Sequence, residues 1–319
     1  MRKFWWLTFF IIPACSCPGA IIDDGSEHTD AGIVGGQNDG GTLGDGGENS
    51  GNDAGENCTP PQVLILLDRT GTMHRDLTGQ TPPATDAGIA SSKLFQAITA
   101  LDSLAGKPGL DQTMKLGLAF FPQDPGGGAC ITLAQRLAGQ NFSNPACESG
   151  QVVIPPAIGT GNAIASLLDP DTTTLCFSTP TGKGLVTAGD ELNSIQQAGT
   201  KQFVMLVTDG ADFYDSCPDP DPMVVLRQLQ AAGIDTFVVG FGAQDTTPQG
   251  VNPPLLNRMA CAGHTAKDFA TECESSPDGG YDAVNKDGGT RLYYDAANST
   301  ELENTLKSIA AQICCDCIL

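Results

Sequence analysis

From residue 62 onward, the chain alternates between two kinds of hydrophobic pattern. One kind is a short, continuous apolar run, which is typical of a strand buried on both faces of a sheet. These runs lie at residues 63–67, 116–121, 152–155, 203–207, 236–241 and 291–294. The other kind is an amphipathic stretch in which apolar residues recur at helical spacing. These stretches lie at residues 91–104, 162–168, 183–197, 224–232, 254–262 and 300–313.

Strands that alternate with helices in this way predict an α/β fold. We expect a doubly wound, mainly parallel, six-stranded sheet with helices on both faces. The run at 152–155 is short and is followed by Pro156, so we expect it to be a short antiparallel edge strand. In such sheets, ligands bind beyond the carboxyl ends of the strands. The residues that follow each strand are therefore the first candidates for a functional site.

The first 17 residues have the pattern of a bacterial export signal. Arg2 and Lys3 precede the apolar run 4–12, which is far shorter than the roughly 20 residues that span a bilayer. The sequence Ile-Pro-Ala-Cys that ends at Cys15 resembles a lipobox, in which the cysteine is lipidated after cleavage. We therefore predict a lipoprotein signal and lipobox in residues 1–17, with Cys15 as the lipidated residue.

Two alternatives to Cys15 remain open. An overlapping match that ends at Cys17 would place the lipid there and leave ten cysteines, enough for five disulfides. An ordinary signal peptide cleaved near Ala20 would leave no anchor. No aspartate follows Cys15 directly, which resembles the sorting signal for the outer membrane. We expect an exported protein, lipid-anchored in the bacterial cell envelope, in the outer membrane at its periplasmic face or at the cell surface.

Residues 18–57 differ in composition from the rest of the chain. They contain 12 glycines and nine acidic residues, with no lysine or arginine and few large apolar side chains. Such a segment cannot bury enough surface to offset the entropy lost on ordering. We predict a disordered acidic tether at 18–57 and one folded domain, with disulfide-bearing loops, at 58–319.

The net charge of −21 divides unevenly among these parts. It is +2 in residues 1–17, −9 in residues 18–57 and −14 in residues 58–319, where 28 acidic residues face 14 basic ones. A domain this acidic is a poor electrostatic partner for nucleic acid or for an anionic lipid surface. We therefore expect no nucleic-acid partner, and contact with the membrane through the lipid anchor alone.

Ten cysteines follow the predicted signal, mostly in expected loops. Loop cysteines of exported proteins usually form disulfides. We predict the pairs Cys130–Cys147 and Cys261–Cys273, and we expect Cys58 to reach the C-terminal group of cysteines, which are Cys314, Cys315 and Cys317. That group could alternatively bind a soft metal, but no second Cys or His pair lies at a suitable spacing.

Oxygen-bearing side chains follow two of the expected strands. Asp68, Thr70 and Thr72 alternate along the turn that leaves the first strand, so one carboxylate and two hydroxyls can converge on one point. Asp209 follows the strand at 203–207. Hard oxygen ligands suit Mg²⁺, Mn²⁺ or Ca²⁺ better than Zn²⁺. Two carboxylates balance a divalent charge and leave the ion able to accept one more oxygen from outside.

The order and spacing of these residues resemble those of the von Willebrand factor type A (vWA) domain, which has a Rossmann-like fold. Members of this family carry a metal-ion-dependent adhesion site, built from an Asp-x-Ser-x-Ser motif, a Thr in the following long loop and an Asp after the fourth strand. Here Asp68, Thr70 and Thr72 match the first motif, with threonine in place of both serines. Thr179 matches the loop position and Asp209 the last one, while Thr181 could serve in place of Thr179.

The resemblance covers roughly residues 60–313 and implies a bound divalent cation, Mg²⁺ first, with Mn²⁺ or Ca²⁺ as alternatives. In the family, an acidic residue of a protein partner fills the open position on the metal. The resemblance thus implies a protein ligand, in adhesion or another protein–protein interaction. The alternative is a structural or assembly component, or an accessory subunit, of an envelope complex in which the metal is incidental.

An enzymatic alternative is more remote. Residues 64–73 also resemble the start of haloacid-dehalogenase-type phosphatases, where a second Asp acts as general acid and base. Thr70 stands at that position, and its hydroxyl cannot shuttle a proton near neutral pH. The three histidines, His28, His74 and His264, come without a Gly-x-Ser-x-Gly motif. We therefore expect no enzymatic activity, and we expect His74 to be a solvated loop residue.

Overall fold

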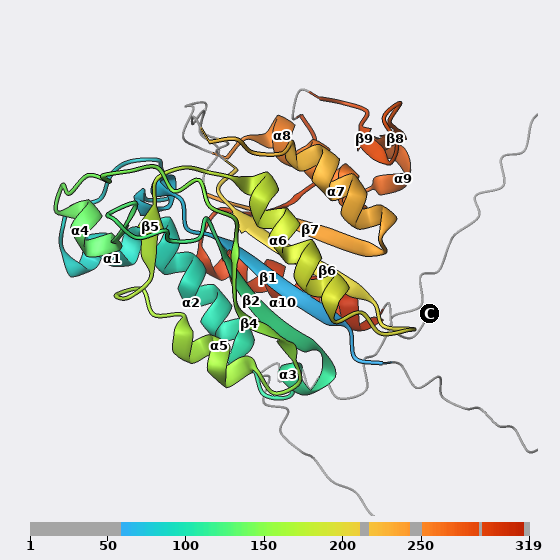
Figure 1. Cartoon of the computed structure of the whole chain (residues 1–319), viewed down its shortest axis with the longest axis horizontal. Coiled ribbons are helices and arrows are strands. Elements are labelled where there is room, and N and C mark those ends of the chain that lie inside the picture. The colour runs from blue at the N-terminus through green and yellow to red at the C-terminus, as the bar shows by residue number, and fades with distance from the viewer. Residues whose placement is uncertain (1–58, 211–216, 243–250, 287–288, 316–319) are drawn as a thin grey trace, which may run out of the picture.

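The computed structural model describes residues 59–210, 217–242, 251–286 and 289–315 (Figure 1). The predicted signal peptide, the tether and Cys58 lie outside these residues, so their assignments stay predictions.

A six-stranded mixed sheet forms the centre of the protein, in the order β10-β7-β6-β1-β2-β4 (Figure 1). Its strands are β1 (Gln62–Asp68), β2 (Lys115–Phe121), β4 (Gln151–Ala157), β6 (Gln202–Thr208), β7 (Ile234–Phe241) and β10 (Tyr294–Ala296). All neighbours are parallel except β2 and β4, which are antiparallel. The predicted fold class, including an antiparallel edge strand, is confirmed.

Alternate residues of β1 point into two hydrophobic cores, one on each face of the sheet. Val63, Ile65 and Leu67 pack with α2 (Lys93–Ala105), α5 (Gly161–Leu167) and α10 (Ser299–Cys315). Leu64 and Leu66 pack on the opposite face with α6 (Thr181–Ser194), α7 (Pro222–Ala231) and α8 (Pro253–Ala262). Burial on both faces explains why these strands are continuously apolar in the sequence.

Smaller elements occupy the loops. The additional helices are α1 (Asp86–Ser91), α3 (Leu110–Thr113), α4 (Leu133–Leu137), α9 (Phe269–Glu272) and the 3₁₀ turn η1 (Gly71–His74). Two antiparallel pairs join β3 (Cys130–Thr132) to β5 (Thr174–Cys176), and β8 (Cys273–Ser275) to β9 (Tyr281–Ala283). The sequence analysis predicted none of these short elements.

Two predicted element positions are wrong in detail. The expected helix at 91–104 begins at Lys93, because Ser92 interrupts the chain in an extended conformation and caps the helix through its hydroxyl, which accepts the Phe95 N–H. The expected strand at 291–294 is shifted, since β10 begins at Tyr294. Leu292 and Tyr293 are apolar because they are buried in the core beside α8, not because they pair in the sheet.

Three disulfides are present among the described residues, and they correct one predicted pair. Cys261–Cys273 is confirmed, whereas Cys130 pairs with Cys176, and Cys147 pairs with Cys217. The predicted pair Cys130–Cys147 is wrong because the antiparallel register of β3 and β5 places Cys130 directly opposite Cys176. The side chains of the C-terminal cysteine group are outside the description, so the pairing proposed for Cys58 stays a prediction.

Within the described parts of the chain, no helix is both long enough and apolar enough to cross a membrane.

Candidate metal centre

The two candidate carboxylates lie at the same edge of the sheet because their strands are parallel neighbours. Asp68 is the last residue of β1, and Asp209 directly follows β6. The register pairs Leu67 with Val207, so both strands end at the same level. Both side chains are fully buried. The sheet thus places two carboxylates close together at its carboxyl edge, as ligand sites of such folds require.

Hydrogen bonds hold the Asp68 carboxylate in place. Its Oδ1 accepts the Thr70 backbone N–H at 2.7 Å, and its Oδ2 accepts the Thr208 hydroxyl at 2.7 Å. Burial raises the pKa of Asp68 to about 7, and the nearby negative charge of Asp209 contributes to the rise, although the hydrogen bonds from Thr208 and Thr70 lower it. Two buried carboxylates side by side repel each other, and a cation bound between them would remove that repulsion.

The turn after β1 brings the two motif threonines together. The hydroxyl oxygens of Thr70 and Thr72 lie 3.1 Å apart, within hydrogen-bonding distance. Asp68, Thr70 and Thr72 therefore occupy one end of one short turn, and the alternation read from the sequence does place one carboxylate and two hydroxyls side by side.

The segment with Thr179 lies alongside this turn. Thr70 and Cys176 form a parallel β-bridge, and the Cys176 N–H donates to the Arg69 carbonyl at 2.8 Å. Three residues further on, Thr179 is buried and lines the same cavity as Thr72. Thr181 is also buried, but it lines a different, smaller pocket beside Thr208 and Gly210. Thr179 thus adjoins the hydroxyl side of the site, and Thr181 adjoins Thr208, which donates to Asp68.

Lys93 is a residue of this site that the sequence analysis missed. It is the first residue of α2, it is 2% exposed, and its ammonium Nζ lies 2.6 Å from Oδ2 of Asp209. In the sequence it lies 116 residues from its partner and opens an ordinary amphipathic helix. No local pattern could have revealed it, because the contact exists only after the sheet has formed.

The chemistry of this donor set fits a small divalent cation. The donors available here are two buried carboxylates and neutral hydroxyls, all of them hard oxygens. The position also already attracts a positive charge, since the Lys93 ammonium binds Asp209 there. Within the described residues, no three His, Cys, Asp or Glu side chains gather to hold a metal, so a cation bound at this position would need the threonine hydroxyls as further ligands.

His74 corrects another expectation. It is 5% exposed, whereas the sequence suggested a solvated loop residue. Its Nδ1 contacts the Gly71 carbonyl, its Nε2 lies 3.3 Å from the Thr81 hydroxyl, and burial lowers its pKa to about 4. The 3₁₀ turn η1 folds the ring back against its own backbone, which explains why a loop histidine is buried here.

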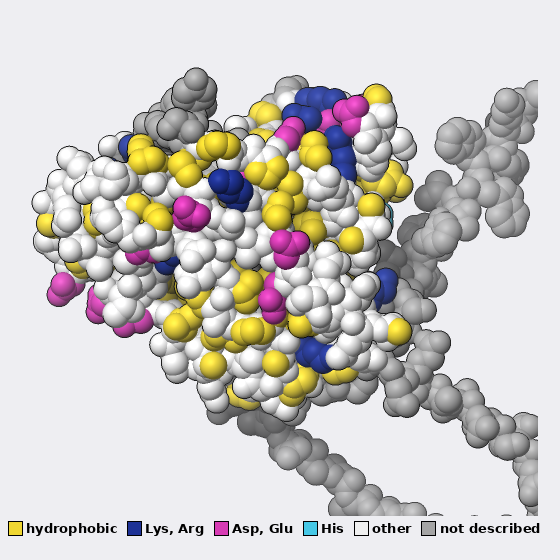
Figure 2. Space-filling view, in the orientation of Figure 1, with side chains coloured by type: hydrophobic (Ala, Val, Ile, Leu, Met, Phe, Trp, Pro, Cys, Tyr) yellow, Lys and Arg dark blue, Asp and Glu magenta, His cyan; other side chains and the backbone are white. Residues whose placement is uncertain are grey.

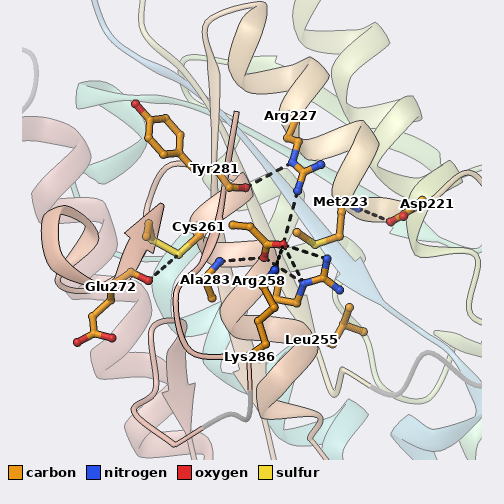
Figure 3. Close-up of polar contacts among 12 residues, drawn as sticks. Asp221, Met223, Arg227, Leu255, Arg258, Cys261, Glu272, Tyr281, Ala283 and Lys286 are labelled. Carbon is orange, nitrogen blue, oxygen red and sulfur yellow. Dashed lines mark hydrogen bonds and ion pairs between the residues drawn. A yellow bond between two sulfur atoms is a disulfide. The ribbon is translucent and has the colours of Figure 1, made fainter. Parts of the chain in front are cut away.

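A second polar cluster lies on the face of the sheet that α7 and α8 cover. Figure 2 shows Lys and Arg side chains gathered there, at the upper right, over α7, α8 and β9. Asp282 of β9 is at its centre. It accepts three hydrogen bonds from Arg258, at 3.0, 3.1 and 3.3 Å, and it pairs with Arg227 at 3.8 Å and Lys286 at 3.2 Å (Figure 3).

This cluster is structural. It joins the β8–β9 hairpin to α7 and α8, next to the Cys261–Cys273 disulfide that joins α8 to β8 (Figure 3). Its three cations, Arg227, Arg258 and Lys286, all contact the one carboxylate of Asp282, and these contacts hold the hairpin against the two helices.

Comparisons with known proteins agree with the fold. Residues 162–277 match the family model of the von Willebrand factor type A domain. The matched vWA segment includes Thr179 and Asp209 and begins after Asp68, Thr70 and Thr72. No curated protein sequence matches the chain.

Solved structures with vWA-like folds are similar to this chain at low identity. Proximal thread matrix protein 1 from the mussel byssus is 11% identical, with a TM-score of 0.47, over 81% of this chain and 47% of the other. A structure of the same mussel protein has zinc in its metal-ion-dependent adhesion site (MIDAS) motif. It is 12% identical, with a TM-score of 0.45, over 80% of this chain and 48% of the other. The pilus adhesin SpaC from Lactobacillus rhamnosus GG is 15% identical, with a TM-score of 0.47, over 80% of this chain and 30% of the other. This chain therefore spans about half, or less, of the length of these proteins.

Proposed function

We propose that the protein is a lipid-anchored lipoprotein of the bacterial envelope whose vWA-type domain binds a protein ligand through a divalent cation. The cation is held by Asp68, Thr70, Thr72, Thr179 and Asp209, with Mg²⁺ as the first candidate. One observation supports this proposal most. Two buried carboxylates, Asp68 and Asp209, lie at the carboxyl edge of the sheet, where the hydroxyls of Thr70 and Thr72 also lie.

In this proposal the bound cation supplies an electrophilic centre for an incoming carboxylate oxygen of the partner. Asp68 and Asp209 supply the negative charge that retains the ion, and the threonines supply neutral oxygens. Two carboxylates leave a divalent ion without excess negative charge around it, which preserves its attraction for an outside anion. No step of this function breaks a covalent bond, so the proposal assigns no enzymatic activity.

Export and anchoring rest on separate observations. The three disulfides are of a kind that persists in oxidising compartments outside the cytosol. The lipobox at Cys15, or at Cys17, supplies the anchor, and the acidic tether at 18–57 holds the domain away from the membrane surface.

Calorimetric titration of the EDTA-treated protein with Mg²⁺ and Mn²⁺ tests the site. We expect Asp68→Ala and Asp209→Ala to abolish binding while circular dichroism shows an intact fold. Asp278→Ala, which removes an exposed carboxylate between β8 and β9, is the matched control. Unchanged binding heats in both site variants would contradict the assignment. Magnesium-dependent phosphate release by the purified protein would instead support the phosphatase alternative.

A second candidate function is favoured by the Lys93–Asp209 pair. Because the ammonium neutralises Asp209 without any metal, the domain could act as a metal-independent scaffold or accessory subunit in an envelope complex. A pull-down from envelope extract with and without EDTA separates the two functions. Capture of the same partner in both conditions would favour the scaffold, and loss of the partner in EDTA would favour cation-dependent binding.

A further inference from the structure

A cavity of about 300 Å³ adjoins the candidate metal centre. It lies at the end of the molecule where Figure 1 shows α4 and β5. Thr72 and Thr179, two of the candidate ligands, form part of its wall, and Arg75, Arg136, Phe142 and Phe177 are further lining residues. A ligand that reaches the cation through this opening would therefore also contact these four side chains.

The cavity is positively charged in a domain that is strongly negative. Arg75 and Arg136 both line it, although acidic residues outnumber basic ones two to one in residues 58–319. Neither guanidinium forms an ion pair with a carboxylate of the described residues. The Nε–H groups of both arginines are buried and have no hydrogen-bond partner. Both arginines thus keep hydrogen-bonding capacity that no described residue uses and a charge that no described carboxylate balances.

Each guanidinium group is held in place through its Nη1. Arg75 Nη1 donates to the Gly79 carbonyl at 2.8 Å. Arg136 Nη1 donates to the Gln140 carbonyl at 3.2 Å and to the Asn141 side chain at 3.1 Å. Because these bonds fix the groups in advance, an anion that pairs with the two guanidinium groups loses little affinity to ordering the side chains.

An aromatic wall completes the cavity. The rings of Phe142 and Phe177 stack with centroids 5.8 Å apart, and the Arg136 guanidinium lies over Phe142 at 5.1 Å. Phe177 is 40% exposed, although its backbone N–H and carbonyl are bonded to Ala129 and Ala146. The adjacent Cys176 is in the disulfide with Cys130. An exposed ring on such a fixed backbone is suited to contact a protein partner.

We propose that this cavity binds an acidic side chain of a protein partner, with its carboxylate paired to Arg75 and Arg136 and its stem against Phe142 and Phe177. A planar carboxylate matches the forked donors of a guanidinium better than a spherical anion does. The proposal rests on the proposed function for the nature of the partner, a protein, and it adds a second anchoring point beside the cation. The preferred ligand is then a segment with two acidic residues, one for the cation and one for the arginines.

The test uses the full chain labelled with ¹⁵N-arginine and two probes, the peptides acetyl-Asp-Gly-Asp-amide and acetyl-Asn-Gly-Asn-amide. In EDTA, we expect the acidic peptide to shift the Nε–Hε resonances of Arg75 and Arg136 in a saturable way, and the amide peptide to leave them in place. Arg75→Gln and Arg136→Gln should each weaken the binding about tenfold, since each removes a charge-assisted hydrogen bond. Lys201→Gln, which removes an exposed charge just before β6, is the matched control.

The outcomes separate this proposal from the proposed function. Shifts in EDTA that Mg²⁺ does not enhance would support the cavity and contradict the cation-dependent function. Enhancement by Mg²⁺ with no shift at either arginine would support the cation and overturn the cavity. Equal weakening by Lys201→Gln, or shifts produced by inorganic phosphate but not by the acidic peptide, would also overturn the assignment to a carboxylate. Because the resonances are observed in the unmodified protein, the test does not depend on the variants folding.

Discussion

The ammonium of Lys93 lies 2.6 Å from the carboxylate of Asp209, and both side chains are buried. The chain thus places its own cation at one of the two carboxylates that are candidates for holding a metal. Asp68, the other carboxylate, has its pKa raised to about 7 by burial and by the charge of Asp209. Without a metal, the lysine is the group that balances charge in this part of the site.

Replacing Lys93 by methionine should make the site bind metal more tightly. The substitution keeps an unbranched side chain that is one atom shorter, and it removes the positive charge that competes with an incoming ion. We expect Mg²⁺ affinity to rise about tenfold or more, as the loss of a close like charge predicts. In EDTA, the free energy of unfolding should fall by about 3 kcal/mol, because Asp209 loses its buried partner. Calorimetric titration and urea denaturation measure the two effects.

Lys115→Met is the matched control for Lys93→Met. Lys115 begins β2 at the opposite end of the sheet, where its ammonium bonds the exposed side chain of Gln197. Its removal should change neither metal affinity nor stability by much. A weaker metal affinity in Lys93→Met would show that the lysine positions Asp209 for the metal instead of competing with it.

The loop ligand can be identified by an isosteric pair of variants. Thr179→Val and Thr181→Val each replace a buried hydroxyl by a methyl group. Because Thr179 shares a cavity with Thr72 and Thr181 does not, we expect only Thr179→Val to lower Mg²⁺ affinity, by about tenfold for one lost oxygen ligand or hydrogen bond. The reverse result in calorimetric titration would assign the ligand to Thr181.

The sequence was sufficient to predict the central sheet because its strands are buried on both faces. Runs such as 63–67 and 203–207 are apolar throughout, and Asp68 and Asp209 stand at their carboxyl ends, so the edge at which both carboxylates lie followed from parallel pairing. The run at 291–294 misled because Leu292 and Tyr293 are buried outside any strand. A run of apolar residues indicates that the segment is buried, but it does not by itself show that the backbone is a strand.

The contacts that the sequence could not predict are long-range ones between loops. The sequence predicts a Cys130–Cys147 pair, but the β3–β5 pairing brings Cys176 opposite Cys130. Lys93 and Arg136 looked like ordinary helix residues, and their positions beside Asp209 and in the cavity depend on how α2 and α4 pack. The hydrophobic periodicity of the sequence carries no information about such long-range contacts.

Removing the Cys147–Cys217 disulfide should loosen the loops around the candidate site. The bridge spans 70 residues and joins the loop before β4 to the segment after Asp209. We expect the double variant Cys147→Ala, Cys217→Ala to lose about 4 kcal/mol of unfolding free energy, from the chain entropy of a loop this long. Mg²⁺ affinity should also fall, which calorimetric titration would show.

The Cys261–Cys273 disulfide is the control for that prediction. It spans 12 residues on the far side of the sheet from α2 and α10. Its removal should cost less, about 3 kcal/mol by the same reasoning, and should leave Mg²⁺ affinity unchanged. Equal effects of the two double variants on metal affinity would contradict a specific role of the Cys147–Cys217 bridge at the site.

The ion-pair cluster around Asp282 predicts a pH-dependent contribution to stability. Burial alone raises the pKa of Asp282, but hydrogen bonds from Arg258, the Ala283 N–H and Lys286 outweigh it, and the pKa lies below its ordinary value. A carboxyl with a lowered folded-state pKa stabilises the fold above its unfolded pKa, which is about 4, and loses that contribution as the pH falls through the folded value.

Asp282→Asn should therefore be less stable than the unmodified protein by about 2 kcal/mol at pH 7, since partly exposed Arg258 and half-buried Arg227 lose their counter-charge. The difference should shrink below pH 4, where Asp282 itself becomes protonated. Urea denaturation at pH 7, 5 and 3 measures this difference, with exposed Asp278→Asn as a control that should change stability little at any pH. A difference that stayed constant from pH 7 to pH 3 would show that the carboxylate charge is not what holds the β8–β9 hairpin against α7 and α8.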